Sequence, residues 1–135
     1  MKKYTILFCL LICLVVVGCS RNKTLTGKVT FTDGKPATCG IVIFQTDNFI
    51  SKGEIMSDGS YTMSSAKEND GIPPGDYKVY VSGITKTGKG SATLLPVPLC
   101  APKFEKPHTS GLTCTIPAPE NKFDIVLEPH PKNYP

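Results

Sequence analysis

Apolar and polar side chains alternate with a period of two along most of this chain, and this pattern limits its possible folds more than any other feature. Between residues 24 and 32, Val29 and Phe31 fall on one face, while the threonines and Lys28 fall on the other. Alternation of this kind is typical of half-buried β-strands. Seven segments show it, or a short continuous apolar run: 24–32, 40–46, 52–56, 60–64, 76–82, 111–116 and 122–128.

Turn sequences separate these segments. Asp33-Gly34-Lys35-Pro36 follows the first, and Ser57-Asp58-Gly59 joins two others, where Asp-Gly favours a tight hairpin. Because no helical period occurs between residues 24 and 129, we expect an all-β fold. A seven-stranded sandwich is favoured over a barrel, since proline is plentiful at the breaks. The predicted core is Val29, Phe31, Ile41, Ile43, Tyr77, Val79, Val81, Phe123, Ile125 and Leu127.

The N-terminus has the organisation of a secretory signal. Two lysines precede an apolar run over residues 4–17, which is shorter than the roughly 20 residues of a membrane-spanning helix. Val16-Val17-Gly18-Cys19 resembles the lipobox of bacterial lipoproteins, in which the cysteine thiol receives a diacylglycerol before cleavage. We therefore expect a signal helix over 1–18 that is removed, and lipid on Cys19. An ordinary signal peptide with an incidental cysteine is the alternative.

Lipid on Cys19 would determine the location of the mature protein. Two acyl chains are sufficient for stable anchoring, so the prediction is an exported protein held at a membrane by its lipid. Ser20 follows the cysteine instead of aspartate, which by resemblance to other lipoproteins predicts the outer membrane where two membranes are present. Residues 19–23 would form a lipidated spacer, 24–129 the domain and 130–135 a tail.

Length and charge limit the function further. Removing 18 of the 135 residues leaves 117, enough for one domain with a core of ordinary size. Loss of the two signal lysines lowers the formal charge from +4 to +2, and no basic residues cluster. A nucleic-acid partner is therefore not expected.

Four motifs in order resemble a known domain: Leu25-Thr26-Gly27-Lys28-Val29, Asp33-Gly34-Lys35-Pro36, Asp58-Gly59-Ser60-Tyr61 and Pro74-Gly75-Asp76-Tyr77-Lys78-Val79. Together they resemble the carboxypeptidase-regulatory-like, or transthyretin-like (prealbumin-like), β-sandwich domain. Pro102-Lys103-Phe104, Thr109 to Thr113 and Asn121 to Asp124 resemble its branch in small lipoproteins of planctomycete-type bacteria. The resemblance spans residues 24 to about 129 and implies an accessory, adhesive or spacer module without shared catalytic residues.

Cysteine content allows one disulfide in the mature chain. With Cys19 lipidated, Cys39, Cys100 and Cys114 remain, which permits three pairings and one free thiol. Cys114 alternates with apolar neighbours and is expected to face the core as a free thiol. We therefore favour Cys39 with Cys100, a bridge that would close a loop of about 60 residues and stabilise the fold by roughly 4 kcal/mol.

The longest connection, 83–110, is the best candidate for a binding segment because connections longer than about 12–15 residues are usually functional or mobile. It carries an apolar patch over 94–99. Tyr80 and Phe49 are weighed as an aromatic platform for a sugar, although the chain has no Trp. The leading interpretation is a non-enzymatic envelope module with a structural or protein-interaction role. The alternative is a glycan- or peptide-binding module that uses 83–110.

Catalytic and metal chemistry find little support in the sequence. His108 lies near Ser110, but a pair adjacent in sequence rarely has the geometry of a triad. Cys100, His108 and Cys114 are spaced by eight and six residues, unlike usual zinc ligands. The aspartates at 33, 58, 70 and 76 are interpreted as turn formers, not calcium ligands. No enzyme activity, metal or cofactor is expected.

Overall fold

Nine β-strands and two short 3-10 helices make up the part of the chain that the computed structural model describes, residues 22–65, 67, 70–87 and 95–132. The fold is all-β, as the alternation predicted. The predicted signal segment and Cys19 lie outside the described residues. The elements are β1 (Thr26–Phe31), β2 (Ile41–Gln45), β3 (Ile50–Glu54), β4 (Ser60–Thr62), β5 (Gly75–Ser82), β6 (Thr85–Thr87), β7 (Pro96–Pro98), η1 (Pro102–Glu105), β8 (Leu112–Ile116), η2 (Pro119–Asn121) and β9 (Ile125–Leu127).

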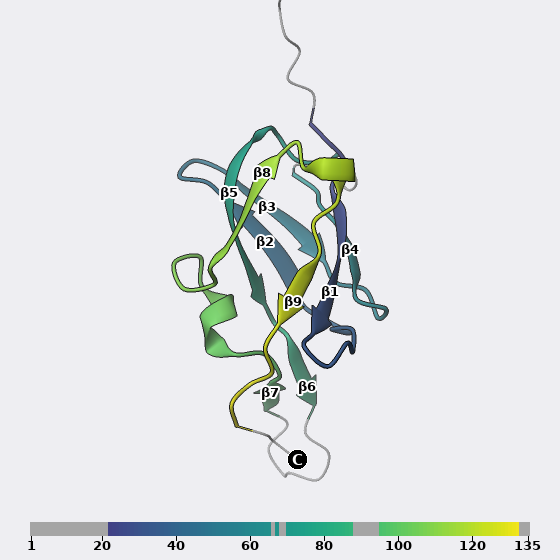
Figure 1. Cartoon of the computed structure of the whole chain (residues 1–135), viewed down its shortest axis with the longest axis vertical. Helices are drawn as coiled ribbons and strands as arrows, with labels where there is room; N and C mark the ends of the chain where they lie inside the picture. Colours follow the sequence, from purple (N-terminus) through teal and green to yellow (C-terminus); the bar gives the residue numbers. More distant parts are fainter. Residues whose placement is uncertain (1–21, 66, 68–69, 88–94, 133–135) are drawn as a thin grey trace, which may run out of the picture.

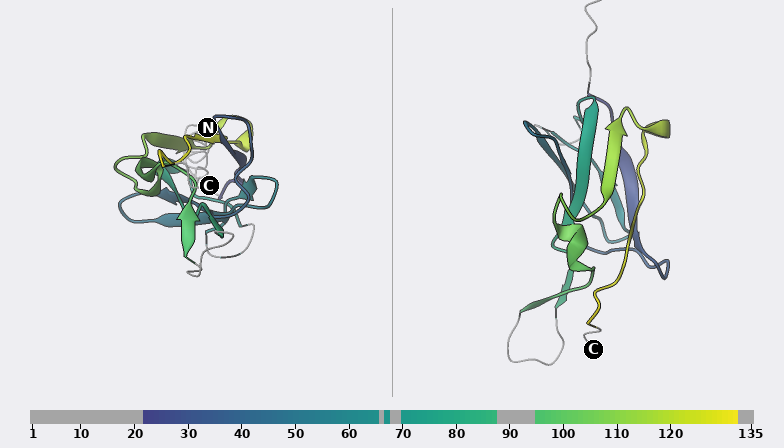
Figure 2. Two further views of the ribbon diagram at one scale, coloured as in Figure 1. Left: turned by 90° about the horizontal axis from the view of Figure 1, so that it is seen from below. Right: turned by 60° about the vertical axis from the view of Figure 1, so that its left-hand side comes forward.

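Two sheets face each other across the core (Figures 1 and 2). One has the strand order β4-β1-β9 and the other β3-β2-β5-β8. All pairings are antiparallel except that of β1 with β9, which is parallel. A third, two-stranded sheet pairs β6 with β7. Among the described residues no helix is long and apolar enough to cross a bilayer.

The described parts of the connection 83–110 contain regular structure that the sequence did not indicate, namely β6, β7 and η1. Three-residue strands are too short for periodicity to reveal, and Pro96 and Pro98 further obscure β7. Proline is tolerated there because each strand of a two-stranded sheet has a free edge. The amide of Leu99 donates to Ile84 O (2.9 Å) within the connection, and the amide of Ala101 donates to Glu128 O (2.9 Å), which ties the connection to the segment that follows β9.

The core lies between the two main sheets and confirms most of the predicted positions. Val29, Tyr77, Val79, Val81, Ile125 and Leu127 are buried in it, and Phe31 and Phe123 are half-buried against them. Tyr77 also donates its hydroxyl to Pro73 O (2.9 Å), as expected for a buried ring whose polar tip reaches the backbone.

The prediction for Ile41 is wrong, since its side chain is 40% exposed. Strand β2 directs Val42 and Phe44 to the core, so Ile41 and Ile43 face outward. A continuous apolar run does not reveal which of its two faces is buried. Ile43 is nevertheless 8% exposed, although it lies on the outer face between Lys52 and Tyr80 in the strand register.

The two ends of the sandwich differ in what they carry. The described chain starts at the upper end in Figure 1, where Lys23 and Ile72 exchange two backbone hydrogen bonds of 2.8 and 2.9 Å. Strands β6 and β7 project from the opposite end (Figures 1 and 2). We call these the anchor end and the distal end.

Candidate functional site

The outer face of β3, β2 and β5 brings together polar and apolar side chains from three strands. The register places Ile41 between Glu54 on β3 and Ser82 on β5. The next outward row consists of Lys52, Ile43 and Tyr80. Because side chains alternate along each strand, all six lie on the face turned away from the core.

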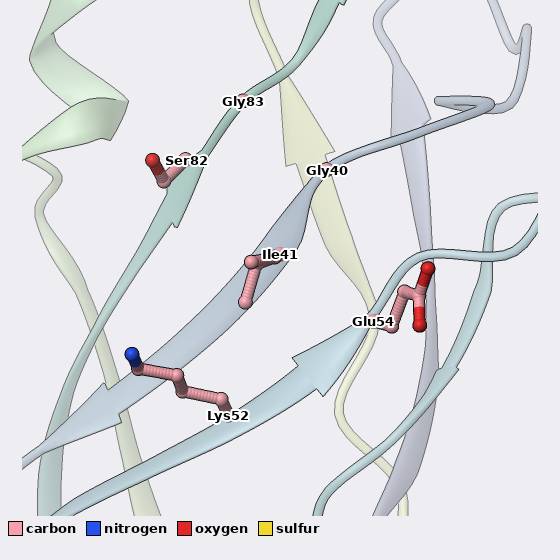
Figure 3. A pocket seen from close by; sticks show the side chains of 6 residues that line it. All are labelled: Gly40, Ile41, Lys52, Glu54, Ser82 and Gly83. Atoms are coloured by element: carbon pink, nitrogen blue, oxygen red, sulfur yellow. The ribbon is translucent and has the colours of Figure 1, made fainter.

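A hollow of about 520 Å³ opens on this face, at the start of β2 and the end of β5. We call it the outer-sheet hollow. Figure 3 shows Ile41 near its centre, surrounded by Ser82, Lys52 and Glu54. Its lining residues are Gly40, Ile41, Lys52, Glu54, Ser82 and Gly83.

Two glycines leave the backbone bare at one end of the outer-sheet hollow (Figure 3). Gly40 has a φ of 116°, and a Cβ there would lie 2.6 Å from Ile84 Cδ1 and 2.8 Å from Ser82 O. Gly83 has a φ of 71°, in the left-handed region that favours glycine, at the point where the chain leaves β5. The same turns that direct the chain into β6 therefore keep this end free of side chains.

Lys52 and Glu54 bring opposite charges to the outer-sheet hollow without pairing with each other. The ion pairs within the described residues are Lys35–Asp33, Lys103–Glu128 and Lys122–Asp124. Both hollow side chains are exposed. The hollow therefore contains one cation and one anion, together with the Ser82 hydroxyl and the apolar surface of Ile41.

A second, smaller hollow of about 330 Å³ is lined by residues that include Gln45 and Lys78, the row beyond Tyr80 on the same face. Its other lining residues are Thr46, Asp47, Asp76, Pro107 and His108. The Tyr80 hydroxyl donates to Gln45 Oε1 (3.0 Å), so its ring lies between the two hollows. Asp76 already accepts a hydrogen bond from Thr115 Oγ1 (2.7 Å).

The aromatic platform weighed for Tyr80 and Phe49 is not formed. Phe49 packs edge-on against Tyr77, with 6.5 Å between ring centroids, on the core side of the sheet. Tyr80 alone lies on the outer face, where it is half-buried. Tyr77 and Tyr80 are three residues apart on β5, so they point to opposite faces of the sheet. Phe49, which packs against Tyr77, is therefore on the opposite face from Tyr80.

The predicted disulfide between Cys39 and Cys100 is not formed, since both are free thiols. The prediction placed both residues near the surface, but Cys100 is fully buried. Cys39 instead directs its thiol at Thr85 O (3.1 Å) and Gly83 O (3.6 Å). Cys114 is a buried free thiol, as predicted.

The buried thiols are poor nucleophiles at neutral pH. Burial raises the pKa of Cys100 to about 11, and burial also raises the pKa of Cys114. Both groups are therefore protonated at neutral pH, whereas the thiolate is the reactive form.

The other polar residues weighed for chemistry have separate roles. Ser110 donates its hydroxyl to Val79 O (2.6 Å) in the interior, while His108 lines the smaller hollow. Asp33 and Asp58 accept backbone hydrogen bonds two residues on, from Lys35 (3.1 Å) and Ser60 (3.0 Å), as predicted for turn formers. In the described ranges no three His, Cys, Asp or Glu side chains are placed to hold a metal ion.

Sequence reasoning did not single out Lys52, Glu54, Ser82 or Gly40 as site residues. Each occupies an ordinary outward or turn position within its own segment. These residues come together because β2 pairs with both β3 and β5. Alternation within a single strand does not reveal which strands become neighbours.

Comparison of the chain with known proteins gives no match to a family model, a curated protein or a solved structure. The outer-sheet hollow is the candidate site, because it combines an apolar patch, two opposite charges and a hydroxyl on one exposed face.

Proposed function

We propose that this chain is a lipid-anchored, non-enzymatic module of the cell envelope, with a structural or protein-interaction role at its distal end. Lipid on Cys19 holds it at the membrane, at the outer membrane where the cell has two. The alternative is a module that binds a glycan or a peptide. The outer-sheet hollow, rather than 83–110 alone, is the surface that favours this alternative.

The observation that carries this proposal is the separation of the two ends of the sandwich. The four residue-to-residue steps from Cys19 to Lys23 span at most about 14 Å when fully extended. Lys23 is itself held by its two hydrogen bonds to Ile72 at the anchor end. A lipid on Cys19 would therefore keep the anchor end close to the bilayer and turn β6, β7 and the distal end toward the envelope space (Figure 1).

The transthyretin-like assignment belongs to the same proposal. It is supported by the four ordered motifs and by the two main sheets, which contain three and four strands when β6 and β7 are set apart. The non-enzymatic assignment is supported by the protonated state of Cys100 and Cys114, whose pKa values burial raises. Ser110 is likewise engaged with the backbone of Val79.

Metabolic labelling with radioactive palmitate tests the anchor. The wild-type chain is expected to carry label in the membrane fraction of a bacterial host. Cys19→Ala should carry none, and the protein should be unprocessed or released, because the thiol that accepts diacylglycerol is missing. Cys39→Ala is the matched control and should be labelled like the wild type. Fatty-acid label on Cys19→Ala would contradict the proposal.

A further inference from the structure

We propose that the outer-sheet hollow binds a neutral saccharide of the envelope. This inference rests on the glycan-binding alternative of the proposed function and deepens it, because it names the chemical class of the ligand. The volume of about 520 Å³ is within the range of about 300–1,000 Å³ found for small-molecule sites. The hollow is also open to solvent on the sheet surface, as a site for one unit of a longer glycan must be.

The charges of the outer-sheet hollow favour a ligand without net charge. Lys52 and Glu54 are two residues apart on β3, so their Cα atoms are separated by about 7 Å along the strand. They have opposite charges and form no ion pair with each other. A sugar hydroxyl both donates and accepts hydrogen bonds, whereas an ammonium group only donates and a carboxylate only accepts. Neighbouring hydroxyls of one sugar can therefore accept from Lys52 and donate to Glu54.

The floor of the outer-sheet hollow suits the apolar side of a sugar ring. Ile41 exposes 40% of its surface at the centre of the hollow, and the bare backbone of Gly40 continues this floor. A pyranose ring presents C–H groups on one face, and their contact with Ile41 would remove apolar surface from water. Ser82 lies on the other side of Ile41 from Glu54, so polar groups border the apolar floor on two sides.

A zwitterionic peptide is the competing ligand, because its two ends could meet the same two charges. Such a ligand has to strip water from two charged groups to occupy the hollow. Removing charged groups from water costs far more than removing neutral hydroxyls. The ion pairs with Lys52 and Glu54 would return little of that cost, because pairs between exposed charges are weak. The neutral saccharide is therefore favoured.

Isothermal titration calorimetry on the full chain in detergent micelles tests this assignment. The probes are maltotetraose, cellotetraose and chitotetraose as neutral saccharides, trigalacturonate as an anion and trialanine as a zwitterion. At least one neutral saccharide should bind with a Kd of about 1 mM or lower. Ile41→Asp and Glu54→Gln should each weaken that binding by about tenfold or more, the effect of losing the apolar floor or one charge-assisted hydrogen bond.

Two matched variants separate the site from the rest of the sheet. Ile50→Asp makes the same change on the same outer face at a similarly exposed residue, 49% exposed, that does not line the hollow. Glu120→Gln is the same substitution as Glu54→Gln, made in η2 at the anchor end. Both controls should bind the saccharide like the wild type, and circular dichroism should show that all four variants are folded.

Three results would overturn the saccharide assignment: no binding of any neutral saccharide, stronger binding of trialanine or trigalacturonate, or equal losses in Ile41→Asp and Ile50→Asp. These results are distinct from failure of the proposed function. If no saccharide binds but Cys19 carries palmitate, the saccharide assignment is rejected and the proposal of a lipid-anchored module is retained. If the wild-type chain binds a saccharide but carries no palmitate, the anchor proposal is rejected and the saccharide assignment is retained.

Discussion

A single residue without a side chain, Gly27, lets two distant segments meet over β1. A Cβ at this position would lie 1.9 Å from Phe123 O and 2.6 Å from Tyr61 Cε1. The Tyr61 hydroxyl donates to that same carbonyl oxygen of Phe123. Gly27 therefore allows the β4 tyrosine to reach across β1 to the segment that leads into β9.

Gly27→Ala should destabilise the domain by about 2–3 kcal/mol, because the new methyl group overlaps a backbone oxygen that has little room to move. Gly34→Ala is the control, since no atom lies within 4 Å of a Cβ there and only its φ of 83° opposes the substitution. That variant should lose about 1 kcal/mol. Urea denaturation of both variants measures the difference. Equal stability of the two would show that the crossing over Gly27 is not tightly packed.

At the scale of the elements, β2 illustrates what an apolar run leaves undetermined. Its residues Ile41 to Phe44 are all apolar, yet only alternate side chains can reach the core. Phe44 is fully buried and packs against the rings of Tyr77 and Phe123, with centroids 5.9 and 5.8 Å away. The outward half of the same strand instead provides the floor of the outer-sheet hollow.

Truncation of the two faces of β2 should therefore have unequal effects. Phe44→Ala is expected to cost about 3–5 kcal/mol, because it leaves a cavity among aromatic rings. Ile41→Ala should cost about 1 kcal/mol or less, since its side chain is partly in water. Thermal or urea unfolding of both variants provides the measurement. A larger loss for Ile41→Ala than for Phe44→Ala would mean that the faces of β2 are reversed.

Sequence patterns predict the strands better than the site. Alternation identifies β1 and β5 and most of their buried residues, because each of these strands has one face in the core. It does not identify β6 and β7, which are three residues long. The outer-sheet hollow depends on which strands become neighbours, and that information is in the pairing of β2 with β3 and β5. The prediction of a Cys39–Cys100 bridge was wrong for a similar reason. Cys100 is buried by the way the elements pack, and the sequence pattern does not reveal that packing.

At the scale of the whole molecule, the long axis of the sandwich separates the proposed point of attachment from the proposed recognition surface. The anchor end contains the Lys23–Ile72 hydrogen bonds and the contact between Asn22 Nδ2 and Ser65 Oγ (3.1 Å). The turn after β1, which contains Lys35, lies at the distal end with β6 and β7 (Figure 1). A short tether would therefore orient the domain as well as retain it.

Site-specific photo-crosslinking in the native envelope tests this orientation most directly. A benzophenone amino acid is placed at Lys67, an exposed residue near the anchor end, or at Lys35, whose side chain is 80% exposed at the distal end. Lys67 should crosslink to lipid, and Lys35 should crosslink to envelope protein or glycan. Lipid crosslinks at Lys35, or at both positions alike, would contradict this orientation.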